Sequence, residues 1–132
     1  MTLKNGVQTI DTFPGKRVVK SGAVGTTNLE EVKWLTQNLV SIAAPWKAEG
    51  WAYIVDITKM DPVSPDVSAE LVNLHKALGE ANCKAMAFVD YCAFVTAVQA
   101  NQHQKQADNG IPQAHFKKDE EALEWIETII GK

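Results

Sequence analysis

The stretch 51–78 constrains the fold most, because it predicts a buried strand, a polar loop and an amphipathic helix in succession. Residues 51–57 are almost continuously apolar, which is typical of a strand that is covered on both faces of a sheet. Ser64 and Pro65 then suit the N-cap and first position of a helix, and Asp66 suits its first turn. This unit predicts an α/β domain, with the loop at the carboxyl edge of a parallel sheet.

Two further signals extend the pattern toward the N-terminus. Residues 7–13 and 17–24 are rich in β-forming side chains, and the Pro-Gly pair between them has the backbone preferences of a tight turn. Thr27 and Glu30 have the spacing of a capping box, and the apolar residues behind them recur with helical periodicity as far as Pro45. This part of the chain predicts an antiparallel hairpin followed by a helix.

The C-terminal half continues the alternation of strands and helices. Residues 84–90 predict a second buried strand, and a third helix is predicted from Tyr91 to Asn109. Residues 111–116 predict a short strand whose proline indicates an edge position, and Asp119 is predicted to cap a last helix. The predicted order is β-β-α-β-α-β-α-β-α. We therefore expect an α/β fold with a mixed, mostly parallel sheet in which the hairpin is the antiparallel edge.

Length and charge narrow the class of protein. The 132 residues fit a single domain, 1–132, and no run reaches the ~20 apolar residues of a membrane span. The net charge of −3 and the single arginine, Arg17, disfavour nucleic-acid binding, which uses basic patches and arginine contacts. Cys83 and Cys92 flank a predicted strand, so they lie roughly 23 Å apart at ~3.3 Å per residue, too far for a disulfide. With no apolar signal core at the N-terminus, we expect a cytoplasmic protein.

Polar side chains gather around the turn between the buried strand and the following helix. They are Asp56, Thr58, Ser64, Asp66 and Ser68. A helix N-terminus at the carboxyl edge of a sheet exposes N–H groups and the positive end of its dipole, so this turn is a candidate site for an anion or a partner. Helix capping by itself also accounts for the serine and the aspartate at the helix start, and we favour that simpler explanation.

Metal and catalytic motifs are weak. Asp56 and Asp90 follow neighbouring predicted strands and together could bind Mg²⁺, but no third acidic ligand has suitable spacing. The three histidines, His75, His103 and His115, lack the spacing of a zinc site and are expected on helix surfaces or strands. We therefore predict no metal and no cofactor. An enzyme is the least supported class, because no nucleophile–base set can be assembled from spacing.

Trp34 lies off the apolar stripe of the first predicted helix. A tryptophan in that position is either a partner contact or is covered by a neighbouring hairpin or loop. Both alternatives stay open at the level of sequence.

Three segments resemble the STAS-type domain of SpoIIAA-like proteins, which are relatives of bacterial anti-sigma-factor antagonists. They are the opening FPGKRVVKSGAVGTTNLEEV, the strand VDIT with the helix start SPDVSAELV, and the C-terminal AHFKKDEEALEWI. In phospho-regulated members, a partner kinase modifies a serine at the start of the helix that follows this strand. The resemblance places Ser64 there, with Ser68 nearby, although the usual Asp-Ser-Ser-Gly pattern is missing. It also implies a likeness to lipid-binding CRAL-TRIO domains.

We therefore expect a non-enzymatic regulatory domain of the STAS type. It would bind a protein partner, or form a homodimer, through the loop and helix start at 58–68. The alternative is a carrier of a small apolar molecule or lipid, held in a pocket between sheet and helices. Tyr53, Phe88 and Phe94 are the expected lining of that pocket, and packing in a solid core accounts for them equally well.

Overall fold

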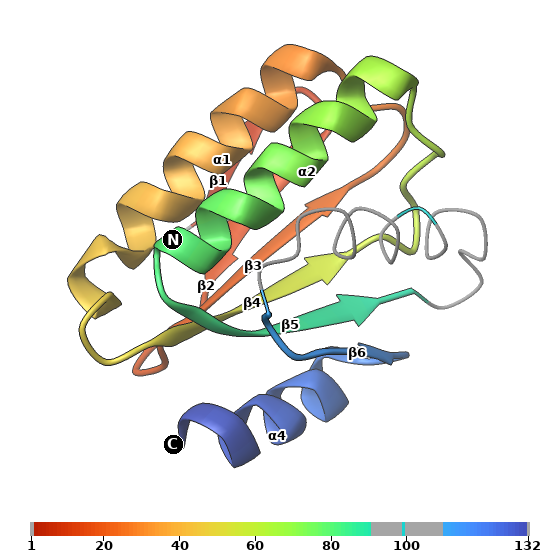
Figure 1. Cartoon of the computed structure of the whole chain (residues 1–132). Coiled ribbons are helices and arrows are strands. Elements are labelled where there is room, and N and C mark those ends of the chain that lie inside the picture. The colour runs from red at the N-terminus through yellow and green to blue at the C-terminus, as the bar shows by residue number, and fades with distance from the viewer. Residues whose placement is uncertain (1, 91–98, 100–109, 132) are drawn as a thin grey trace.

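A six-stranded sheet with helices on both faces forms the structure (Figure 1). The computed structural model describes residues 2–90, 99 and 110–131. The strands lie in the order β1-β2-β3-β4-β5-β6. Neighbours are antiparallel from β1 to β3 and parallel from β3 to β6. The strands are β1 (Thr2–Asn5), β2 (Gln8–Thr12), β3 (Val18–Ala23), β4 (Trp51–Asp56), β5 (Cys83–Val89) and β6 (Gln113–Phe116).

Two long helices cover one face of the sheet and a third covers part of the other (Figure 1). The helices are α1 (Leu29–Ala43), the short 3₁₀ helix η1 (Ala44–Trp46), α2 (Pro65–Glu80) and α4 (Asp119–Ile130). Helices α1 and α2 pack side by side over one face, and α4 packs mainly on β4 and β5 from the other. No helix in the described part of the chain is long and apolar enough to cross a membrane. The predicted α/β fold with its mixed sheet is confirmed.

The core has two layers because successive side chains of a strand point to opposite faces of the sheet. In β4, Trp51 and Tyr53 join the cluster beneath α1 and α2, whereas Ala52 and Ile54 join the cluster beneath α4. All four are buried. The prediction that this strand is covered on both faces is therefore confirmed.

The predicted hairpin exists, but the sheet contains one more strand than the sequence analysis predicted. The hairpin strands are β2 and β3, and β1 pairs with β2 through a turn between Asn5 and Gln8. Gly6 has φ 59 there, the left-handed conformation that a two-residue hairpin turn favours at its first central position. The Asn-Gly pair is a turn signal, but the strand before it has only one apolar residue, Leu3.

Two helix starts differ from the prediction by one residue. The N-cap of α1 is Asn28, not Thr27: Asn28 Oδ1 accepts the Glu31 N–H at 2.9 Å, and Glu31 Oε1 accepts the Asn28 N–H at 3.4 Å. The predicted box with Glu30 was wrong because Glu30 is exposed, whereas Glu31 turns inward. The N-cap of α4 is Lys118, and Asp119 is its first helical residue and forms an ion pair instead of a cap.

The other predicted boundaries agree with the structure, and one predicted helix lies outside the described residues. Helix α1 ends at Ala43 just before Pro45, and Ser64 is the N-cap residue of α2. Strand β6 lies at an edge of the sheet, as its preceding proline indicated. The third predicted helix, Tyr91 to Asn109, lies outside the described residues except Gln99. Phe94, Cys92 and His103, which belong to it, lie outside as well.

Candidate functional site

The loop after β4 lies against the loop after β3, so two segments share the carboxyl edge of the sheet. Gly25 donates its N–H to the Lys59 carbonyl at 2.9 Å, and Asp61 donates its N–H to the Gly25 carbonyl at 3.0 Å. Thr26 Oγ1 adds a hydrogen bond to Asp61 Oδ2 at 2.7 Å. We call residues 24–26 together with 58–68 the edge surface. Sequence spacing indicated only the second of its two parts.

Val24 is the most exposed large apolar residue of the edge surface. Its relative exposure is 67%, against 37% for Val40 and 39% for Ile129, the other exposed large hydrophobic residues in the described part of the chain. Strand β3 turns Val19 and Ala23 into the core, so the residue after its end faces outward. The sequence analysis missed Val24 because it placed this residue within a predicted strand, 17–24, whereas β3 ends at Ala23.

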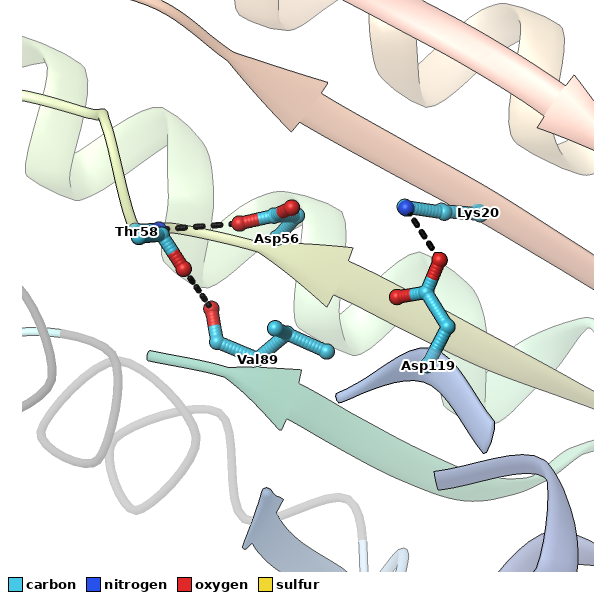
Figure 2. A network of polar contacts seen from close by, with 5 residues as sticks. All are labelled: Lys20, Asp56, Thr58, Val89 and Asp119. Carbon is cyan, nitrogen blue, oxygen red and sulfur yellow. Dashed lines mark hydrogen bonds and ion pairs between the residues drawn. The ribbon is translucent and has the colours of Figure 1, made fainter. Parts of the chain in front are cut away.

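Asp56 and Thr58 are held by the sheet rather than free at its edge (Figure 2). Asp56 Oδ1 accepts the Thr58 N–H at 3.0 Å, and Thr58 Oγ1 donates to the Val89 carbonyl at 3.3 Å. This is the common role of an aspartate at a strand end, where the carboxylate bonds a nearby backbone group. The two residues join the ends of β4 and β5.

Ser64 and Asp66 are exposed at the start of α2. The Ser64 hydroxyl makes no capping bond to the helix backbone and donates to Asp66 Oδ1 instead. That bond, with a smaller contribution from the Val67 N–H, holds the pKa of the Asp66 carboxyl below its usual value. Ser68 is half-buried one turn further on, where its N–H bonds the Ser64 carbonyl at 2.8 Å. Capping therefore does not account for the side chain of Ser64.

Trp34 is half-buried and packs against the cluster beneath α1 and α2. Of its two alternatives, the structure favours covering by neighbouring residues for much of the ring. A part of the side chain remains accessible on α1.

The two aspartates that the sequence analysis weighed as metal ligands have other partners. The Asp90 carboxylate is hydrogen-bonded to His115 Nδ1 on β6, and Asp56 is engaged by Thr58. Within the described residues, no group of three or more His, Cys, Asp or Glu side chains could hold a metal ion. His75 is buried, so its predicted surface position is wrong; α2 turns it toward Phe88, with ring centroids 6.5 Å apart.

A small recess lies between the sheet and helices α1 and α2. Tyr53 and Phe88 line it, as the alternative function predicted, together with Leu74 and His75. Its volume is about 40 Å³. A single water needs ~10–15 Å³, so the recess has room for about three waters and is too small for a lipid chain. The Tyr53 hydroxyl is hydrogen-bonded to Ser21, and burial raises the pKa of Tyr53.

Comparisons with known proteins identify the fold. No protein-family model and no curated protein matches the sequence. Among solved structures, the chain is similar to an uncharacterized protein of the DUF3478 family with a SpoIIAA-like fold, from Shewanella loihica PV-4. The two share 19% sequence identity with a TM-score of 0.71, over 95% of this chain and 98% of that one. An identity this low establishes the fold and no activity. The chain has a SpoIIAA-like fold, as the resemblance of its strand, loop and helix segments implied.

Proposed function

We propose that this chain is a protein-interaction domain of regulatory type that binds its partner through the edge surface. The observation that supports the proposal is the bridge between Gly25 and Met60, which joins two exposed loops into one surface. The partner is a second polypeptide, either another protein or a second copy of the chain. The buried free thiol of Cys83 is compatible with action in the reducing cytoplasm.

The composition of the edge surface suits a protein partner. Val24 supplies exposed apolar area, and the same surface carries the exposed polar side chains of Lys59, Asp61, Ser64 and Asp66. Protein interfaces commonly combine an apolar centre with a polar, solvent-accessible rim. Two backbone hydrogen bonds and one side-chain hydrogen bond already hold the two loops together, so binding would order little additional chain.

Site-specific photo-crosslinking tests the proposal without knowledge of the partner. A benzophenone side chain would replace Val24 in one variant and Val40 in another, and both would be expressed in the native host. Val40 is the matched control, because it is an exposed valine on α1, away from the edge surface. We expect a discrete crosslinked polypeptide from position 24 and none from position 40. Equal yields at both positions, or no adduct from position 24, would contradict the proposal.

Ser64→Ala and Asp66→Ala refine the assignment to residues. Each should reduce the crosslink from position 24, while the free energy of unfolding falls by no more than the ~1 kcal/mol typical of helix-start residues. Intact-mass analysis of the same host-expressed protein tests phosphorylation of Ser64 or Ser68. A phosphate on Ser64 would replace its bond to Asp66 by repulsion between two anionic groups, and so would change the rim of the surface.

Small-ligand carriage is a second candidate function. It is favoured by one observation, the recess that Tyr53 and Phe88 line. At about 40 Å³ the recess admits a ligand of only a few heavy atoms unless its walls move. Native mass spectrometry of gently purified protein would show a mass excess that is lost on denaturation; an unliganded mass would count against carriage.

A further inference from the structure

A second concave site lies on the opposite face of the sheet from α1 and α2. Helix α4 covers β4 and β5 there, and beside its N-terminus a groove of about 440 Å³ opens over β2 and β3. Ligand pockets commonly have volumes of about 300–1,000 Å³. The floor is formed by residues that are neighbours in the sheet: Thr9 pairs with Gly22, which pairs with Asp56, and Asp11 pairs with Lys20.

Lysines from three separate segments line this groove, although the chain as a whole is acidic. They are Lys20 of β3, Lys59 of the loop after β4, and Lys117 and Lys118 before α4. Lys20 pairs with Asp119 at 2.5 Å (Figure 2). Lys59 and Lys118 are exposed, and neither forms an ion pair with any other residue that the structure describes. Two ammonium groups are therefore available to an anion.

The three aspartates of the groove are already engaged. Asp119 is paired with Lys20, Asp56 accepts the Thr58 N–H, and Asp11 accepts a hydrogen bond from the Thr2 hydroxyl. A carboxylate has two oxygens and about four acceptor positions, so each aspartate can still accept a hydroxyl from a ligand. The groove thus combines cationic groups for an anion with acceptors for hydroxyl groups.

Gly22 leaves the floor of the groove open. A Cβ atom there would meet Asp56 Cβ and the Asp56 carbonyl oxygen at 3.5 Å and Thr9 Oγ1 at 3.8 Å, which are ordinary contact distances. The sheet would therefore accept an alanine, and close packing does not require the glycine. A methyl group at this position would occupy the space above the row formed by Thr9, Gly22 and Asp56.

We propose that this groove binds a small organic phosphate that also carries hydroxyl groups. The phosphate lies near Lys59 and Lys118, where charge complementarity is greatest, and hydroxyl groups of the ligand bond the aspartates of the floor. The groove shares Val24, Thr58 and Lys59 with the edge surface, and the rest of its lining lies outside that surface.

Amide-resolved NMR titration of the whole chain with ribose 5-phosphate and with glycerol 3-phosphate tests the proposal. We expect saturable shifts at Lys20, Gly22 and Lys118 below about 10 mM, which is weak but specific binding. Ribose alone should give no saturable shift. Raising the ionic strength should weaken binding, because salt screens exposed charges.

Three variants outside the edge surface decide the assignment. Lys117→Glu with Lys118→Glu reverses two charges of the groove and should weaken binding at least tenfold. Lys33→Glu with Lys76→Glu changes the net charge equally on exposed positions of α1 and α2 and should leave binding unchanged. Gly22→Ala should abolish binding while the thermal midpoint of unfolding is retained. Absence of saturable shifts with both phosphates, or equal binding by the groove and control charge variants, would overturn the proposal.

Discussion

The start of helix α1 provides the sharpest test of the structure, because two adjacent glutamates compete for one role. Glu31 is only 9% exposed and accepts the Thr27 hydroxyl at 2.9 Å. It also accepts the N–H groups of Asn28 and Val7, each at 3.4 Å. Glu30, the partner that spacing alone predicted, is exposed. Glu31→Ala would therefore remove the acceptor of three donors, and Glu30→Ala would remove none that the structure describes.

The size of the effect follows from these contacts. A buried hydrogen bond to a charged group contributes ~1.5–3 kcal/mol, and we assign that range to the short bond from Thr27. The two N–H groups lie beyond the usual bonding distance and contribute about 0.5 kcal/mol each. Alanine recovers a few tenths of a kcal/mol of helix propensity, about 0.3. The expected loss for Glu31→Ala is therefore about 2–4 kcal/mol, and for Glu30→Ala about 0.5 kcal/mol or less.

Urea unfolding followed by far-ultraviolet circular dichroism measures this difference. For a domain of this size, a loss of 2–4 kcal/mol moves the urea midpoint by about 1–2 M, with an unchanged slope. The Glu30→Ala midpoint should lie close to that of the unmodified chain. If Glu30→Ala costs as much as Glu31→Ala, the capping box begins at Thr27 and the structural assignment of this helix start is wrong.

Three further predictions rest on single contacts. Gly6→Ala should lower the free energy of unfolding by about 2 kcal/mol more than Gly15→Ala. Both glycines have positive φ, but only at Gly6 would a Cβ meet Glu31, 1.7 Å from Oε2. In a Glu31→Ala background the two losses should become equal, and a persistent difference in a double-mutant cycle would refute this. Burial raises the pKa of the Cys83 thiol from 9.0 to about 12, so the folded state retains a proton that the unfolded state loses above pH 9. The free energy of unfolding should therefore fall between pH 9 and 12, by up to ~1.4 kcal/mol per pH unit. Urea midpoints should follow this fall, and they should fall less steeply in Cys83→Ala. Trp51→Phe should lower the free energy of unfolding by about 1–3 kcal/mol, because the buried indole N–H donates to the Ala81 carbonyl at 2.9 Å; a thermal midpoint equal to that of the unmodified chain would show that this bond contributes nothing.

Elements with strong local signals were predictable from sequence. The continuous apolar run of β4, the periodic stripes of α1 and α2 and the Pro-Gly turn each act over a few residues, so no distant contact is needed to recognise them. Strand β1 lacked such a signal. Its four residues are largely polar, and they form a strand because β2 offers them hydrogen-bonding partners.

The residues of the candidate site also differ in whether sequence could predict their positions. Sequence by itself determined that Asp56, Thr58, Ser64 and Asp66 lie around one strand-to-helix turn, because chain connectivity keeps them together. It could not determine that Val24 joins them, since pairing of Gly25 with Met60 brings together loops 35 positions apart.

Tertiary structure also decided which polar side chains lie next to one another. Glu31 rather than Glu30 caps α1 because the turn at Gly6 and Val7 lies against it. Lysines from β3, the loop after β4 and the connection between β6 and α4 meet in one groove because parallel pairing aligns β3, β4, β5 and β6. Local propensity operates within a turn or a strand, whereas strand register and burial depend on the whole chain, and only the folded chain sets them.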